Sequence, residues 1–390
     1  MSAIGSVQLG LRIGPGTPGP APGRLMRALR NVEVTQQDSA PCGFQLTFSA
    51  DAAAEGEQLA IADDPLLAPF NRVLVRTAVD GVAQTLIDGY ITHQQHLPAN
   101  GPQGSTFLVT GEDVSVKLDL VDYSREFPAF TDAMTVEEIL LPWAAILGLV
   151  PEVIPTPTSL VPVQSVPQQT ETDRALLARL ARQNGYVFYV TPGEEPFTNV
   201  AYWGPPPRGG APQGLLDVAV GAASTVDSLQ ARYDALAPVT YFGYVIETLV
   251  EPFLPVPVLT LQSTRTPSLA AKPALTAEDF LSLTGRHELW REDQLDPVTA
   301  NVRAQALTDV STDAVVQAEC EVSVTRLGRI LAAPGVVGVR GAGEAYDGLY
   351  YLKSATHRIG LGHDAGWDYT QQLTMTREGT GTTTTTLRGG

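Results

Sequence analysis

Short segments in which apolar and polar residues alternate dominate the first third of the chain. Alternation at every second position places the apolar side chains on one face of a β-strand. Segments of this kind cover residues 32–35, 44–49, 73–79 and 105–111. Asp80-Gly81 follows the third segment directly, and this pair is typical of the two-residue turn of a β-hairpin. The pattern predicts a first antiparallel β-barrel domain over residues 29–120.

The spacing of apolar residues becomes helical after residue 120. Thr135-Val-Glu-Glu138 matches a capping box, which predicts Thr135 as the N-cap of a helix that ends at Gly148. Pro142 lies inside this segment. Because a proline in a helix interior removes a hydrogen bond, it predicts a kink or a break into two short helices.

A second helix has clearer limits. Thr172 is predicted as its N-cap, and Asn184-Gly185 as its end. Its apolar face is formed by Leu176, Leu177 and Leu180. A strand is expected directly afterwards, at residues 186–190. With the proline-rich connector before it, this region predicts a mixed helical and β insert domain over residues 121–212.

Alternation resumes near Leu215 and continues almost to the end of the chain. Residues 262–295 interrupt it with a polar, irregular excursion, and Asp296-Pro297 is a typical helix start. These features predict a second β-barrel domain over residues 213–378. Glycine and proline make up eight of the ten residues 14–23, which predicts a flexible N-terminal arm over residues 1–28, and residues 379–390 read as a flexible threonine- and glycine-rich tail.

One similarity connects the two predicted barrels. Thr92-His93 is followed by a strand that ends at Glu112, and Thr356-His357 by a strand that ends at Glu378. This indicates a duplicated β domain in which His93 and His357 are equivalent; a chance likeness of two hairpins is the alternative. The expected fold class is therefore α+β, mainly β, with two related antiparallel β-barrels and a mixed insert between them.

Composition excludes several functions. The chain has 390 residues and a net charge of −17 without any cluster of lysine and arginine, which argues against direct nucleic-acid recognition. No membrane span is expected, because the apolar segment 140–150 is too short and contains a proline. The N-terminus lacks the pattern of a signal peptide, so synthesis in the cytoplasm is expected. Cys42 and Cys320 form no CxxC pair, so a thiolate zinc site is not expected.

No residue pattern indicates catalysis. Gly14, Gly16 and Gly19 match GxGxxG, but the prolines among them and the lack of a predicted strand before them argue against a dinucleotide site. His93 and His96 lie three apart at a strand end, where they would face opposite sides of a sheet. Adjacent glutamates at 137–138 and 194–195 read as solvated surface. We therefore predict no catalytic, cofactor-binding or metal-binding residue, no cofactor, and no enzyme activity.

The order of elements resembles one family. The segments NVEVTQQDSAPCGFQLTFSAD and RVLVRTAVDGVAQTLIDGYITHQQH look like the opening of tail hub proteins of contractile injection machines. ETDRALLARLARQNGYVFYV is similar to that family's acidic-start helix followed by a strand, and PGVVGVRGAGEAYDGLYYLKSATHRIG to its closing β unit. The family includes the late control D proteins of contractile phages and the hub portion of valine-glycine repeat spike proteins.

This resemblance implies a structural role. Hubs of the family form homotrimers whose paired barrels match a trimeric spike to the hexameric inner tube, around a central channel. The chain lacks the needle of the longer spike proteins, so a separate spike protein is expected. The first ring of the tube protein, baseplate wedge proteins and cargo in the channel are further expected partners. The expected location is the baseplate of a phage tail, tailocin or phage-tail-like particle, where much of the negative charge would line the channel.

Two alternatives stay open on the sequence. Abundant carboxylates are compatible with a tail-associated cell-wall hydrolase, which needs two carboxylates across a cleft. A β-rich glycan-binding module would present rows of aromatic side chains on an exposed face. Aromatic residues make up only 7% of the chain, which makes this second alternative the weaker one.

Overall fold

A computed structural model describes most of the chain. The described residues are 7–50, 61–98, 104–128, 130–156, 168–218, 224–247, 254–282, 285–292, 295–362 and 366–383. His363, most of the proline-rich connector and the last seven residues of the tail lie outside these ranges.

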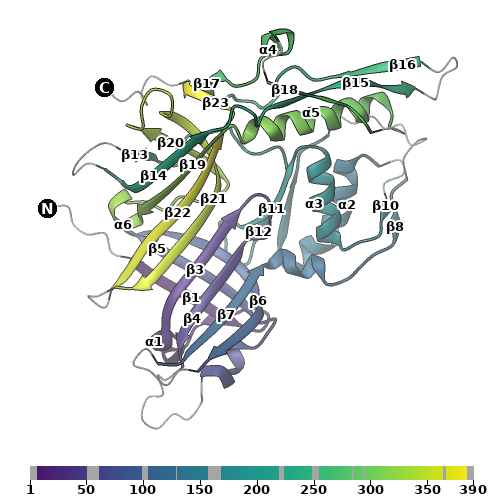
Figure 1. Ribbon diagram of the computed structural model, residues 1–390. Helices are drawn as coiled ribbons and strands as arrows, with labels where there is room; N and C mark the ends of the chain where they lie inside the picture. Colours follow the sequence, from purple (N-terminus) through teal and green to yellow (C-terminus); the bar gives the residue numbers. More distant parts are fainter. Residues whose placement is uncertain are drawn as a thin grey trace.

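A 13-stranded sheet is the largest element of the fold (Figure 1). Its main path runs β14-β19-β22-β21-β3-β4-β7-β6-β5-β1-β2, and β20, with β13 beside it, joins at β21. The strands are β1 (Val7–Gly14), β2 (Gly19–Pro20), β3 (Leu29–Gln37), β4 (Gly43–Ser49), β5 (Arg72–Val79), β6 (Val82–Leu97), β7 (Thr106–Asp113), β13 (Leu215–Asp217), β14 (Val226–Tyr233), β19 (Val316–Ser323), β20 (Gly335–Arg340), β21 (Gly348–Leu361) and β22 (Trp367–Arg377). Except for β13 with β20, the pairs are antiparallel.

The sheet unites the two β regions that the sequence predicted as separate barrels. β21 is long enough to change partners along one edge: Gly348–Leu352 pairs with β20, and Ser354–Gly360 pairs with β3. The register shifts at a bulge between these two halves. The mainly β class is confirmed, but two barrel domains are not, because strands of both β regions lie in this one sheet and no closed barrel is found among the described residues. The predicted domain boundaries stay predictions.

Alternation along the strands builds the cores as expected. In β3 and β4, Val32, Val34 and Leu46 are almost completely buried, while their neighbours are half-exposed. Asp80 and Gly81 form the predicted hairpin turn between β5 and β6, with φ values of 50° and 83°. Positive φ at both positions is the geometry that favours this residue pair.

The N-terminal segment is not the flexible arm that its composition suggested. Residues Val7–Gly14 form β1, which pairs with β5 along its whole length and buries Leu11 and Ile13. The prolines and glycines that follow form the turn after β1, the short strand β2 and the start of the short helix α1 (Gly23–Ala28). A strand does precede the GxGxxG match, contrary to expectation, but a second strand follows it rather than a helix.

The predicted insert contains two helices and a three-stranded sheet. α2 (Asp132–Leu147) and α3 (Asp173–Gln183) pack with the sheet of β11 (Val187–Pro192), β12 (Asn199–Gly204) and β9 (Leu149–Val153). β8 (Arg125–Glu126) pairs with β10 (Gln168–Gln169) at one side. The short 3₁₀ helices η1 (Ile61–Asp63), η2 (Pro65–Leu67) and η3 (Val114–Asp119) lie before this region.

The expected start of the first helix was wrong. Thr131, not Thr135, is the N-cap of α2, and its hydroxyl accepts a hydrogen bond from the backbone of Met134. Thr135 lies one turn inside the helix, where its hydroxyl donates to the Thr131 carbonyl. α2 continues through Pro142 as one helix, so the break did not occur. Its end at Gly148, with φ of 68°, is confirmed, as is the Thr172 cap of α3.

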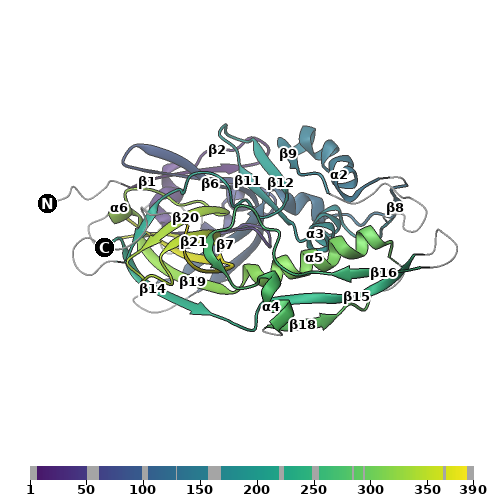
Figure 2. The ribbon, with the colours of Figure 1, turned by 90° about the horizontal axis from the view of Figure 1, so that it is seen from above.

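The polar excursion belongs to a larger unit than predicted. β15 (Val239–Glu247) is the centre of a sheet ordered β16-β15-β18, with β16 (Leu254–Leu259) and β18 (Arg286–Leu289) at its edges. α5 (Pro297–Asp313) packs beneath this sheet (Figures 1 and 2). α4 (Ala277–Ser282) and β17 (Ala270–Pro273) complete the region. The polar segment was expected to be irregular, but β18 pairs with β15 in parallel, which only the fold reveals.

The tail is also partly ordered. Gly379–Thr382 forms β23, which pairs with β17 and corrects the expectation of a flexible tail at these residues. α6 (Val324–Leu327) follows β19 directly.

The equivalence of the two histidines is not supported by the strand register. His93 pairs with Thr110, two residues before Glu112, whereas His357 pairs with Gln371, seven residues before Glu378. His93 is exposed and His357 is completely buried. The two Thr-His pairs therefore occupy different positions in their hairpins.

Candidate interaction surface

In the unit formed by β15, β16, β18 and α5, the helix has a well-formed N-terminal cap. The Asp296 carboxylate accepts hydrogen bonds from the backbone N–H groups of Val298 and Thr299, both at 3.0 Å. Pro297 occupies the first helical position, where no N–H is needed. This confirms the helix start predicted from Asp296-Pro297.

Small residues let the sheet lie close to the helix. Ala300 and Ala304 of α5 are completely buried against Val245 and Trp290. Gly243 gives Trp290 room, because a Cβ at that position would lie 3.0 Å from the Trp290 Cβ. The inner face of the sheet is thus closed by α5.

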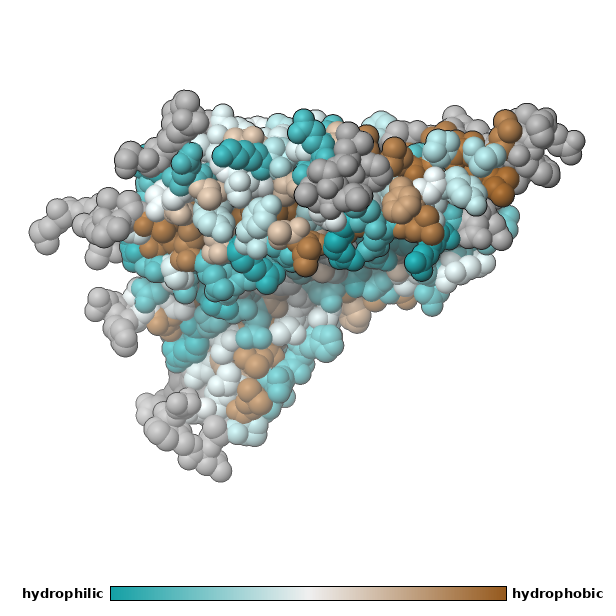
Figure 3. Space-filling model, turned by 45° about the horizontal axis from the view of Figure 1, so that its top comes forward, coloured by the Kyte–Doolittle hydropathy of each residue, from teal (hydrophilic) through white to brown (hydrophobic). Residues whose placement is uncertain are grey.

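The outer face of the same sheet is apolar and exposed. Phe242, Tyr244 and Ile246 of β15 alternate with the buried positions and are 40%, 66% and 55% exposed. They pair across the sheet with exposed residues of the same character, which are Leu259, Pro257 and Pro255 of β16 and Leu289 of β18. We call these seven residues the apolar face. Brown side chains mark the projecting end of β15 and β16 in Figure 3.

Large exposed apolar patches are typical of interaction sites on proteins. Pro255 and Pro257 also determine how such a contact can form. Proline lacks a backbone N–H and is tolerated in an edge strand where that group would point away from the partner strand. The outer edge of β16 therefore lacks two donors and is a poor template for an added strand. The face, rather than this edge, is the surface available for binding.

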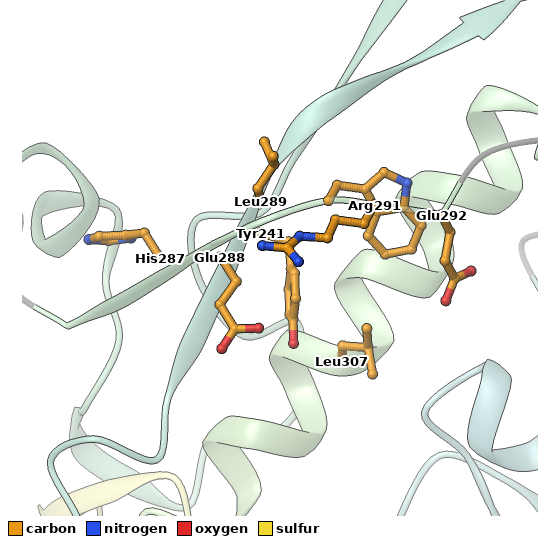
Figure 4. A pocket seen from close by; sticks show the side chains of 8 residues that line it. Tyr241, His287, Glu288, Leu289, Arg291, Glu292 and Leu307 are labelled. Carbon is orange, nitrogen blue, oxygen red and sulfur yellow. The ribbon is translucent and has the colours of Figure 1, made fainter.

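A pocket of about 560 Å³ lies between β18 and α5. Figure 4 shows Tyr241 and Glu288 on the side of the strands that faces Leu307, and Leu289 on the opposite side. Burial and the nearby Glu288 carboxylate raise the pKa of Tyr241, so its hydroxyl stays protonated at neutral pH. Glu288 is paired with Arg286 at 2.5 Å. The lining of the pocket, which includes Glu288, Arg291 and Glu292, thus carries both signs of charge.

The residues considered for chemistry on the sequence are scattered. His93 and His96 are both exposed, and His96 contacts the edge of Phe107. The glutamates at 137–138 and 194–195 are exposed on separate elements. Within the described ranges, no group of three or more histidine, cysteine, aspartate or glutamate side chains could hold a metal ion.

His357 is part of a buried hydrogen-bond network. Its Nε2 donates to Gln36 Oε1 at 3.1 Å, and its Nδ1 accepts from the Tyr369 hydroxyl at 2.7 Å. Burial lowers the pKa of His357 to about 3, so the ring is neutral. Gln36 also donates to the Leu86 carbonyl and accepts from the Ala333 backbone. The network joins the two β regions, and no sequence signal could have found it because Gln36 and His357 are 321 residues apart.

A second buried cluster was also missed by the sequence. Arg208 contacts both Glu378, at 2.7 Å, and Asp313. Arg265 binds the other oxygen of Asp313 at 3.0 Å. Burial raises the pKa of Glu378, but Arg208 and the donors around the carboxylate outweigh it and lower that pKa overall. These ion pairs connect the segment around Arg208 to α5 and to the residue that follows β22, so they have a structural role.

In the parts of the chain that the structure describes, no helix combines the length and apolarity needed to cross a bilayer.

Comparison with solved structures identifies the fold. A 43 kDa tail protein of prophage MuSo2 from Shewanella oneidensis matches with a TM-score of 0.61 at 15% identity, over 96% of this chain and 99% of that chain. The tail protein from Neisseria meningitidis MC58 matches with a TM-score of 0.60 at 14% identity, over 96% and 97%. No protein-family model and no curated protein matches the sequence.

Part of a larger protein has the same fold. A chain of the Francisella PdpA–VgrG complex matches with a TM-score of 0.54 at 7% identity, over 95% of this chain and 53% of that one. The expected resemblance to tail proteins and VgrG-type spike proteins is thus confirmed at the level of the fold.

Proposed function

We propose that this chain is a structural hub protein in the baseplate of a contractile injection machine. The observation that carries the proposal is the fold match to two tail proteins, which extends over nearly the whole of all three chains. The exposed apolar face supports it, because a component of a larger assembly needs a surface for a neighbouring protein.

The hub is a homotrimer with a central channel. It binds a separate trimeric spike protein at one end and the first ring of the hexameric tube at the other, with baseplate wedge proteins around it. The particle is a phage tail, a tailocin or a related phage-tail-like machine. The described surface offers extended sheet and an apolar face for such contacts, which suits a protein that acts by assembly rather than catalysis.

The trimer can be tested on the purified chain. One copy has a mass of 41.5 kDa, so light scattering should give about 125 kDa, and electron microscopy should show particles with threefold symmetry. Adding the spike protein and the tube protein of the same particle should produce a larger complex. A chain that stays monomeric even with both partners present would contradict the proposal.

A further inference from the structure

A second exposed apolar surface lies on the insert. Leu141 and Ile146 of α2 are each 67% exposed, and Val150 of the adjoining β9 is 54% exposed. Pro142 and Ala145 lie between them on the exposed side of the helix. No charged residue occurs from 139 to 151. We call these five residues the helix patch.

The elements that carry the apolar face and the helix patch lie on opposite sides of the molecule (Figure 2). In Figure 2, β15, β16 and β18 follow one side, α2 and β9 lie along the other, and α5 and α3 lie between them. A contact between two patches of one chain is therefore ruled out within a single copy. Each patch is open to a neighbouring molecule.

We infer that the apolar face of one copy packs against the helix patch of the next copy. The occupant of the apolar face is thus a second copy of this chain, and the inference rests on the proposed homotrimer. A ring of identical subunits built from head-to-tail contacts needs two different surfaces on each chain, directed to its two neighbours. The chain supplies two such surfaces, and both are apolar.

Charge favours this arrangement. Each copy carries a net charge of −17, so two copies repel each other over much of their surfaces. The seven residues of the apolar face and the five of the helix patch are all uncharged, and repulsion is least where they meet. A stable interface has about 20 to 30 residues on each side. The two patches therefore form the apolar centre of a larger contact, where single substitutions have their greatest effect.

Complementary variants test the pairing. Tyr244→Asp places a charge in the apolar face, and Ile146→Asp places one in the helix patch. Both side chains are more than half exposed, so the fold tolerates either change. Val82→Asp is the matched control, because Val82 is 72% exposed at the hairpin between β5 and β6. Analytical ultracentrifugation over a range of concentrations measures the mass of each variant.

We expect the control to behave as the wild type, and each patch variant to dissociate at concentrations at least tenfold higher than the wild type does. An equal mixture of the two patch variants should form a one-to-one dimer of about 83 kDa. The Tyr244→Asp chain keeps an intact helix patch, and the Ile146→Asp chain keeps an intact apolar face. One sound contact remains, but the ring cannot close.

Other results would overturn the inference. If all variants stay trimeric like the wild type, the trimer stands and this contact is wrong. If only one patch variant dissociates, or the mixture stays monomeric, the two patches do not bind each other. A wild type that is monomeric at every concentration would overturn both the trimer and the contact.

Crosslinking gives a second readout that does not depend on charge. Tyr244→Cys and Ile146→Cys combined in one chain should form intermolecular disulfides up to a covalent trimer on mild oxidation. The two native cysteines are buried, so they should not form competing crosslinks. Each single cysteine variant should stay uncrosslinked. A covalent dimer from Tyr244→Cys alone would show that the apolar face binds itself and would contradict the inference.

Discussion

Among single residues, His357 has the clearest consequence for stability. Its pKa is about 3 in the folded protein and near 6.5 when exposed. Between these values the unfolded chain binds a proton that the folded chain does not. The contribution of His357 is therefore complete above about pH 6.5 and is lost as the pH falls toward 3, by about 1.4 kcal/mol per pH unit.

The His357→Gln variant isolates this effect. Other buried groups titrate in the same range. Burial raises the pKa of Asp113 to about 6, so through this group acidification increases the stability of the folded protein. The difference in urea unfolding free energy between wild type and variant should therefore be compared at pH 7 and pH 5. We expect the advantage of the wild type to shrink on acidification. An advantage that is equal at both pH values would contradict the prediction.

A second residue-level prediction concerns Asp88. Its carboxylate accepts two hydrogen bonds of 2.7 Å from Arg72 and one of 3.2 Å from Asn199 of the insert. Asp88→Ala would leave the buried Arg72 guanidinium without its carboxylate partner, so we expect a loss of about 3–5 kcal/mol in the free energy of unfolding.

The matched control for Asp88 is Glu33→Ala, which breaks the exposed ion pair with Arg358. This change should cost less than about 1 kcal/mol. Chemical denaturation followed by circular dichroism measures both variants. Equal losses for the two would show that burial does not determine the strength of the Asp88 contacts.

At the level of elements, the cap of α5 supports the apolar face. Asp296→Ala removes two hydrogen bonds to the first turn and should lower the free energy of unfolding by about 1 kcal/mol. Asp296→Asn keeps an acceptor oxygen and should recover most of the loss. Thermal denaturation compares the three proteins, and an alanine variant as stable as the asparagine variant would argue against the capping role.

Local chemistry made several elements predictable from the sequence. Asp80-Gly81, Thr172 and Asp296-Pro297 each act through neighbouring backbone groups, so the sequence alone locates a turn and two helix starts. The first helix was misplaced because Thr135 and Glu138 have the spacing of a capping box although Thr131 supplies the cap. β1 was missed because the adjoining glycines and prolines outweighed its own alternation.

Non-local pairing hid the remaining features. β18 becomes a strand by pairing with β15, more than 30 residues earlier. The apolar face could not be recognised from the sequence because both faces of β15 are apolar: Tyr241 and Val245 lie on one face, and Phe242 and Tyr244 on the other. A strand that is apolar on both faces reads as fully buried. Only the position of α5 shows which face is covered.

At the scale of the whole molecule, the continuous sheet should determine the order of local opening. β3 and β21 lie inside the sheet, each with strands on both sides, whereas β14 forms one end of it. We expect backbone amides of β3 and β21 to exchange with deuterium much more slowly than those of β14. Hydrogen exchange followed by mass spectrometry tests this. Equal protection in β14 and β21 would contradict it.

The pairing of β3 with β21 also has a consequence for synthesis. Thr35 and Thr356, which face each other across these strands, are separated by 321 residues. At about 5–20 residues per second on the ribosome, β3 waits roughly 15–60 s for its partner. During this time one edge of the first β region is unpaired and open to strands of other nascent chains. The sheet therefore cannot be completed before β21 has left the ribosome, and a chain truncated before β21 would keep the edge of β3 unpaired and prone to aggregation.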